Sequence, residues 1–178
     1  MKEYIKGLAE EFAASHDLKL HISYSMPEGY EDAYGTFDVV QNTLFLNLDI
    51  LHGQPKYEIL FYLFHELRHA EQYLHPERFD RTIQNSISYV ILYNGVCFKL
   101  ADGEWKQCRL TGDEDYFSLA YQNLPYEIDA NKFACEKAKT LCPEDVDEIE
   151  ALCDLWIPKK GFLQEEFEKL FRRIDESI

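Results

Sequence analysis

The sequence predicts a single domain of the α+β class, in which a small, strongly twisted sheet packs against one long helix. Its 178 residues are enough for one compact domain with a sizeable core and too few for two ordinary ones. Runs rich in β-forming residues lie in two stretches, 18–48 and 86–110, and helical patterns occupy most of the rest. The longest helical pattern spans 56–74 and is strongly apolar, so we expect that helix to be buried.

The first third of the chain predicts a helix, a strand and a strand pair ahead of the long helix. Apolar side chains of residues 2–15 fall on one helical face, and residues 18–24 alternate as a strand does. Residues 36–40 and 43–48 predict a hairpin or a bent strand pair. The long helix is expected to end at His75, because the following proline disfavours helical geometry in the residue before it.

A β-rich insertion is predicted at about 82–112. Its β-forming runs are separated by Asn94-Gly95 and by a segment containing Asp102-Gly103, and both dipeptides are strong hairpin signals. We interpret the insertion as a small antiparallel meander, with a helix over 82–93 as the competing interpretation. The three expected strands span 86–93, 96–100 and 105–110.

Two cysteines of the insertion are expected to face each other. If Asp102-Gly103 forms a two-residue turn, counting outward places Cys97 opposite Cys108. We expect two reduced thiols packed as small apolar groups. A disulfide or a second metal site is the alternative.

Three helices are predicted towards the C-terminus. The first is expected to pack in the core, and the last two to cover the sheet or the insertion. They are expected over 124–141, 143–156 and 162–175.

Composition and charge restrict the partners. The chain has 33 acidic and 18 basic residues, a net charge of −15, so nucleic acids and anionic membranes are disfavoured and a basic protein substrate would be attracted. No apolar run approaches the roughly 20 residues that span a bilayer. Five cysteines occur without a CxxC pair, and residues 1–12 do not resemble a signal peptide. We therefore expect free thiols and a cytoplasmic location.

The most informative motif is His65-Glu66-Leu67-Arg68-His69 on the long helix. Residues four apart lie on one helical face, so the two imidazoles can hold one Zn²⁺ ion. Glu66 then lies where it can reach a metal-bound water rather than the metal, and can act as the general base. The motif predicts a hydrolytic zinc site.

A third ligand is needed, and two residues compete for the role. Glu127 shares a helical face with alanines, which would let its helix approach the long helix closely. His75 lies ten residues after His65, the spacing of a second class of zinc peptidase, but Gln72 stands where that class has a turn-permitting glycine. We expect Asp129 to point away from the site and to be solvated. Asn131 could orient Glu127 or be a plain surface amide.

Together these segments resemble the ImmA/IrrE-like metallopeptidases, a gluzincin-type group of zincins. The resemblance covers roughly residues 35–140 and rests on GTFDVVQNTLFLNLD, which begins at Gly35, on FHELRHAEQ and on EIDANKFA. The first histidine motif occurs in many zincins. Its combination with a later Glu-x-x-Ala-Asn-x-Phe-Ala is more specific.

The resemblance implies a zincin-like fold and one metallopeptidase domain over residues 1–178. It implies that His65, His69 and Glu127 bind zinc and that Glu66 is the catalytic base. It also implies an edge strand beside the active-site helix, at about residues 43–48, which could bind an extended peptide by β-augmentation.

The match has two departures. Arg68 stands where the family usually has glycine, so this side chain is expected to narrow the cleft or to contact a substrate carboxylate, with a solvated side chain as the alternative. The interval between His69 and Glu127 is longer than is usual in the family, and the insertion would fill it.

The expected function is therefore that of a cytoplasmic zinc endopeptidase acting on a protein substrate. The alternative is a catalytically silent zincin-fold protein that binds or regulates a partner, and a weaker one is an accidental motif without metal. The developing oxyanion needs a further electrophile besides zinc. Proximity in sequence offers four candidates, Tyr62, Arg68, Tyr126 and His75.

Overall fold

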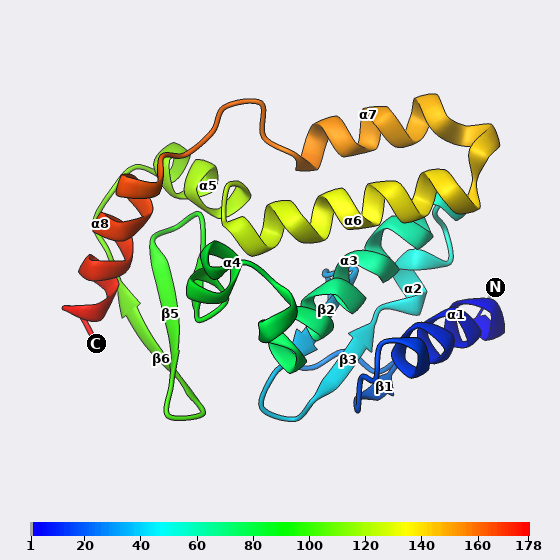
Figure 1. Ribbon diagram of the computed structural model, residues 1–178, viewed down its shortest axis with the longest axis horizontal. Coiled ribbons are helices and arrows are strands. Elements are labelled where there is room, and N and C mark those ends of the chain that lie inside the picture. The colour runs from blue at the N-terminus through cyan, green and yellow to red at the C-terminus, as the bar shows by residue number, and fades with distance from the viewer. Residues whose placement is uncertain (1) are drawn as a thin grey trace.

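The computed structural model describes residues 2–178 as an α+β arrangement with two small sheets and long helices (Figure 1). The N-terminal elements are α1 (Lys2–Ser15), β1 (His21–Ser23), β2 (Gly35–Asp38), β3 (Thr43–Leu46), α2 (Leu48–Leu51) and α3 (Lys56–Leu74). The middle of the chain forms η1 (Pro76–Arg78), α4 (Arg81–Ser86), β4 (Tyr89–Ile91), β5 (Val96–Ala101), β6 (Glu104–Arg109) and α5 (Glu114–Gln122). The C-terminal elements are α6 (Pro125–Leu141), η2 (Pro143–Asp145), α7 (Val146–Trp156) and α8 (Gln164–Asp175).

The first sheet has the order β1-β3-β2, with β1 parallel and β2 antiparallel to β3. The predicted strand pair is thus confirmed as an antiparallel hairpin. The predicted edge strand at 43–48 is wrong, because β3 is the central strand, and β1 and β2 form the two edges, with β2 the edge strand beside α3. The reason is that residues 18–24 supply only the short strand β1, which pairs with β3 from the other side.

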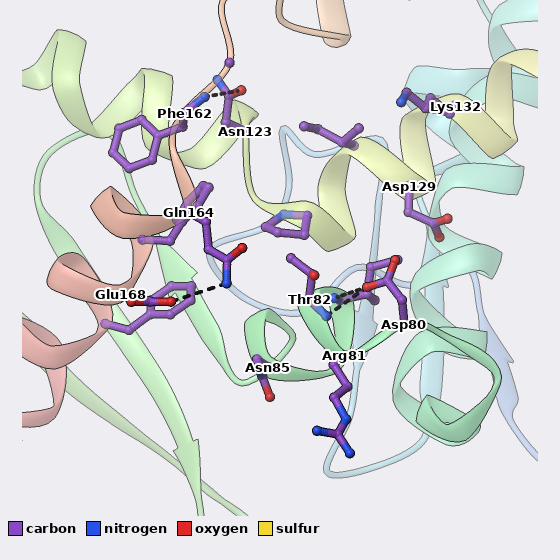
Figure 2. A pocket seen from close by; sticks show the side chains of 16 residues that line it. Asp80, Arg81, Thr82, Asn85, Asn123, Asp129, Lys132, Phe162, Gln164 and Glu168 are labelled. Carbon is purple, nitrogen blue, oxygen red and sulfur yellow. Dashed lines mark hydrogen bonds between the residues drawn. The ribbon is translucent and has the colours of Figure 1, made fainter.

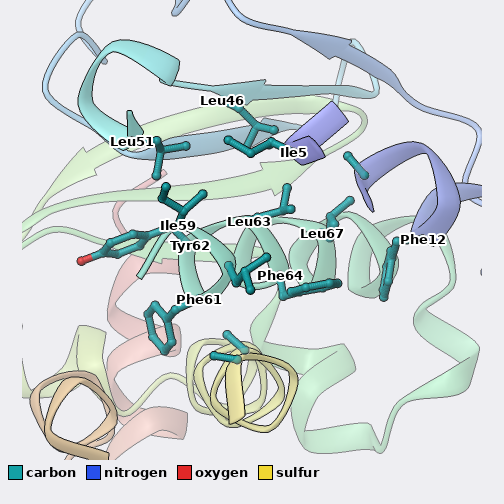
Figure 3. Close-up of a cluster of buried hydrophobic side chains, with 14 of the residues drawn as sticks. Ile5, Phe12, Leu46, Leu51, Ile59, Phe61, Tyr62, Leu63, Phe64 and Leu67 are labelled. Carbon is teal, nitrogen blue, oxygen red and sulfur yellow. The ribbon is translucent and has the colours of Figure 1, made fainter. Parts of the chain in front are cut away.

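The long helix α3 spans the residues predicted for it and lies in the centre of the larger core cluster (Figure 3). Leu60, Leu63 and Leu67 are fully buried, and each such side chain contributes roughly 1.5–3 kcal/mol by leaving water. Helix α1 and the first sheet cover one side of α3. Helix α6 packs along the other side, so α3 is held in one position by both neighbours.

The predicted insertion forms the second sheet, with the antiparallel order β4-β5-β6. Asp102 and Gly103 both have positive φ angles, so they form the expected two-residue turn, and Cys97 pairs with Cys108 as predicted. The helical alternative is partly right as well, because α4 covers residues 81–86 before β4 begins.

The two C-terminal helices cover different parts of the molecule. Phe171 of α8 stacks on Tyr89 of β4 with ring centroids 4.0 Å apart, so α8 covers the insertion as expected. Helix α7 packs on α6 instead. The helices α2 and α5 were not predicted.

The cysteines differ from the expectation in one pair. Cys135 of α6 and Cys153 of α7 form a disulfide, which joins these two neighbouring helices. Cys97, Cys108 and Cys142 are free and buried. The expectation of five free thiols is therefore wrong. The pairing could not be predicted, because five cysteines permit many connectivities and the sequence alone does not choose among them.

Hydropathy gives one negative result. None of the helices described over residues 2–178 combines the length and the apolar character that crossing a membrane requires.

Candidate metal centre

Helix α3 brings the two histidines of the motif to one side. The side chains of His65 and His69 lie one turn apart, and their Nε2 atoms approach to 2.9 Å. Both rings are largely enclosed, with 14% and 11% of their side-chain surface exposed. The apolar residues of α3 fix the rotation of the helix, and that rotation turns the histidines towards α6.

Helix α6 supplies the third side chain. Pro125 occupies the first position of this helix, which sets the start of the helix and places Glu127 in its first turn. Ala130, Ala134 and Ala138 are fully buried, as their shared face predicted, and their small side chains let α6 lie close to α3. Glu127 is itself buried, and it faces the two histidines.

The three side chains converge on one point. Glu127 Oε2 lies 3.6 Å from His65 Nε2 and 3.5 Å from His69 Nε2. A tetrahedral zinc ion with bonds of about 2.0–2.1 Å separates its ligand atoms by roughly 3.3 Å. The observed triangle is close to that size. The residues therefore fit a zinc ion in donor type and in spacing, with a fourth position left for water or substrate.

A buried amide orients His69. Gln72 Oε1 lies 2.9 Å from His69 Nδ1, while Gln72 Nε2 donates to Tyr126 O at 2.9 Å and to Asp129 Oδ2 at 2.8 Å. Because the amide nitrogen has two acceptors, its oxygen must accept from His69 Nδ1–H. The Nε2 atom of His69 is then the ring nitrogen that can bind a metal once its own proton is displaced.

The Gln72 contact is part of a larger buried network. Arg68 donates to both carboxylate oxygens of Asp129, at 2.7 and 3.2 Å, and to Glu71 at 2.8 Å. Its guanidinium lies between the rings of Phe79 and Phe133. The expectation that Arg68 narrows the cleft or contacts substrate is wrong, because all its polar groups face this network. Asp129 points away from the three ligands as expected, but it is paired rather than solvated.

His65 has an unpaired atom on its far side. Both His65 Nδ1 and Asn131 Oδ1 are buried without a hydrogen-bond partner in the described chain. Asn131 donates to Trp156 O at 3.2 Å, so this amide is fixed near His65 and does not orient Glu127. With a metal on Nε2, His65 would carry its proton on Nδ1, and the oxygen of Asn131 is an unpaired acceptor for it.

Charges at the site are tightly coupled. Burial and the neighbouring His69 lower the pKa of His65 to about 4. Burial also disfavours charge on His69, but the adjacent Glu127 outweighs it and raises the pKa of His69 to about 9. Burial opposes ionisation of Glu127 as well, yet His69 holds the pKa of that carboxyl below its usual range. A metal ion would have to displace the proton held between His69 and Glu127.

Glu66 lies beside the convergent ligands, under the edge strand. Burial raises the pKa of Glu66 to about 7; His69 opposes that rise and Glu127 adds to it. A Cβ atom at Gly35 would come within 2.8 Å of Glu66 Cγ and 3.0 Å of Phe45 O. Gly35 of β2 therefore leaves the space that the Glu66 side chain occupies.

Two of the residues considered for other roles are engaged elsewhere. His75 Nε2 lies 3.1 Å from Asp17 O, and its Nδ1 lies 3.2 Å from Glu77, so His75 is not the third ligand and cannot act as an electrophile here. Tyr126 donates its hydroxyl to Tyr89 O at 3.0 Å, away from the ligands.

Two tyrosines that the sequence analysis did not name lie close to the carboxylates. The charge of Glu127, followed by burial and Glu66, raises the pKa of Tyr121 well above its ordinary value. Burial and then Glu127 raise the pKa of Tyr73. Both hydroxyls keep their protons at neutral pH and can donate. Asp113, which caps α5 ahead of two acidic residues, was the signal that could have placed Tyr121 on a helix.

A cavity of about 760 Å³ lies on a different face of α6, between α4, α6 and α8 (Figure 2). Asp129 and Lys132 line one side of it and Phe167 and Phe171 the other. None of the three convergent side chains lines this cavity. A second cavity, of about 680 Å³, lies between α3 and α7 and includes Tyr62, one turn before His65.

Comparison with known proteins gives no match: no family model, no curated protein and no solved structure is similar to this chain. The resemblance to the ImmA/IrrE-like metallopeptidases therefore rests on the sequence motifs alone.

Proposed function

We propose that this protein is a zinc-dependent peptidase that hydrolyses peptide bonds of a protein substrate. His65, His69 and Glu127 would hold the ion, and Glu66 would act as the general base. The observation that carries the proposal is the convergence of three ligand atoms within 2.9–3.6 Å, from two helices that are far apart in sequence. When bound, zinc would polarise the substrate carbonyl and acidify a water molecule.

Glu66 is placed to act as the general base. Burial raises its pKa to about 7 in the metal-free site, and beside a zinc ion the carboxylate would be ionised and could accept a proton from water and pass it to the leaving amine. Its side chain fills the space that Gly35 leaves open.

Tyr121 is the best-placed donor for the developing oxyanion. Its hydroxyl remains protonated, and Glu127 and Glu66 both lie close enough to raise its pKa. Tyr62 stacks on Tyr34 with ring centroids 3.7 Å apart. It is the one residue that remains of the four that the sequence offered as the electrophile, and it is the second candidate for this role.

The edge strand β2 offers a place for an extended substrate. Tyr34 O accepts from Asn47 N at 2.9 Å, so alternation along the antiparallel pair turns the N–H and C=O groups of Gly35 and Phe37 away from β3. These groups can pair with a peptide backbone. Strand β2 takes the role that the sequence analysis assigned to residues 43–48.

Zinc content and one substitution test the proposal. Untagged protein should hold one zinc per chain by elemental analysis, and chelator should abolish cleavage of an unfolded protein such as casein. Glu66→Gln should keep the zinc and lose the cleavage. A zinc-loaded wild-type protein that cleaves nothing, or a Gln variant as fast as wild type, would contradict the mechanism. A zinc-loaded protein without cleavage activity would favour a catalytically silent zincin-fold binding protein.

We further propose a cytoplasmic location. Cys97 and Cys108 support it, because they face each other across paired strands and remain separate thiols. The Cys135–Cys153 disulfide is the opposing observation. Alkylation of thiols in rapidly quenched cells distinguishes the two, since cytoplasmic protein should be modified at all five cysteines.

A further inference from the structure

Two residues that line the cavity between α3 and α7 lie on the same side of α3 as Glu66, the proposed general base. Glu58, Tyr62 and Glu66 follow one another at four-residue intervals, so they share one side of α3. Glu58 is thus two helical turns, roughly 12 Å, from Glu66. A long side chain of a substrate residue next to the cleaved bond can span most of that distance.

Aromatic rings and carboxylates form the walls of this cavity. Tyr62 meets Trp156 edge-to-face, with centroids 6.1 Å apart, and Tyr57 stands beside them. Glu58 enters from α3 and Glu148 from α7. Aromatic faces together with carboxylates attract a cation, and the rings also pack on its apolar stem.

The negative charge of the cavity is not neutralised by the protein itself. Its lining contains no lysine or arginine, and over residues 2–178 neither Glu58 nor Glu148 forms an ion pair. Burial raises the pKa of Glu58, and burial followed by these two carboxylates raises the pKa of Tyr57. A cation in the cavity would favour the ionised form of Glu58 and so offset the effect of burial.

We propose that the cavity between α3 and α7 receives a lysine or arginine side chain of the substrate, and that Glu58 and Glu148 select it. This inference rests on the proposed function, because the cavity is assigned to the substrate of the same site. The net charge of −15 acts in the same direction, since it favours the approach of basic proteins. The contacts in the cavity would in addition select at which position of the substrate the basic residue stands.

Peptide binding tests the inference without turnover. The full chain with Glu66→Gln is titrated with fluorescent alanine-rich octapeptides that carry lysine or norleucine at one scanned position. At one position we expect lysine to bind about tenfold more tightly. Glu58→Gln should reduce this ratio to about twofold, and Glu148→Gln should reduce it less, because that carboxylate is exposed. The control Glu165→Gln makes the same charge change on the exposed side of α8 and should preserve the ratio.

Cleavage of a peptide library by the wild-type protein separates this inference from the proposed function. Zinc-dependent cleavage with lysine or arginine enriched at one fixed position supports both. Zinc-dependent cleavage without that enrichment upholds the peptidase and overturns the assignment of the cavity. Lysine-selective binding that depends on Glu58, with no cleavage of any peptide, upholds the cavity and overturns the peptidase. A lysine preference that Glu165→Gln weakens as much as Glu58→Gln overturns the cavity, because it reports net charge alone.

Discussion

The contact between Gln72 and His69 offers a direct test of how the chain prepares its metal site. We predict that Gln72→Leu weakens zinc binding although residue 72 would not touch the ion. Leucine has nearly the size of glutamine, so the packing of this fully buried position is largely kept. What is lost is the hydrogen bond that holds the His69 ring and its tautomer.

The expected magnitudes follow from the three hydrogen bonds of Gln72. Loss of an outer partner of a ligating histidine typically lowers metal affinity 10–100-fold, which is about 1.4–2.7 kcal/mol. The substitution also leaves His69 Nδ1 buried without a partner, at about 1–3 kcal/mol, and removes the Gln72 bond to Tyr126 O, at about 0.5–1.5 kcal/mol. Asp129 keeps its contacts with Arg68. We therefore expect the free energy of unfolding of the metal-free protein to fall by about 2–5 kcal/mol.

Two measurements and a matched control complete the test. Competition with a zinc chelator gives the dissociation constant, and urea unfolding of metal-free protein gives the stability. The control is Gln84→Leu in α4, which removes a single hydrogen bond to Phe79 O outside the site. It should lower stability by about 1 kcal/mol and leave zinc affinity unchanged. If Gln72→Leu binds zinc within twofold of wild type, Gln72 does not orient His69 and the reasoning fails.

Three further predictions concern the neighbouring residues. Gly35→Ala should push against the Glu66 side chain, lower kcat and reduce the free energy of unfolding by about 1–3 kcal/mol. The zinc content should stay at one ion per chain. An unchanged kcat would show that Glu66 has room to move. Tyr121→Phe should lower kcat about 10²-fold with zinc and KM retained, as steady-state kinetics would show, and an effect on KM alone would rule out oxyanion stabilisation. Folding raises the pKa of Glu66 from 4.5 to about 7, so the folded metal-free protein binds more protons than the unfolded one between these values and its stability falls as pH rises through them. Glu66→Gln should therefore stabilise the metal-free protein at pH 8 by about 1–3 kcal/mol and hardly at pH 4.5, as urea unfolding at the two pH values would show. Equal effects at both pH values would contradict burial as the cause of the raised pKa of Glu66.

The elements that carry the site could be predicted because local signals define them strongly. Helix α3 has a long apolar pattern that starts after a proline and stops before one, and α6 has a proline at its first position. These two helices contain every residue assigned to the metal. The turn at Asp102-Gly103 could be predicted for a similar reason, since its two residues tolerate positive φ angles and so fix the register of the hairpin.

The remaining features depend on contacts between distant residues. Gln72 meets Asp129 across 57 positions, so no local pattern could reveal that the amide is tied to a carboxylate. The order of the first sheet depends on where β1 docks, which the strand patterns do not determine. Helix α5 is only nine residues long, and its position over Glu127 follows from packing. The sequence therefore indicates the candidate ligands better than it indicates the residues that position them.

The bonds between Arg68, Asp129, Gln72 and Tyr126 also bear on what loss of the proposed zinc ion would do to the protein. They join α3 to α6 directly, and none of them involves an atom that would coordinate the ion. Small zinc-finger domains unfold on demetallation because the ion is their main cross-link. If the site holds zinc as proposed, these bonds would keep α3 and α6 together without it. The same folded molecule could then release the ion and bind it again.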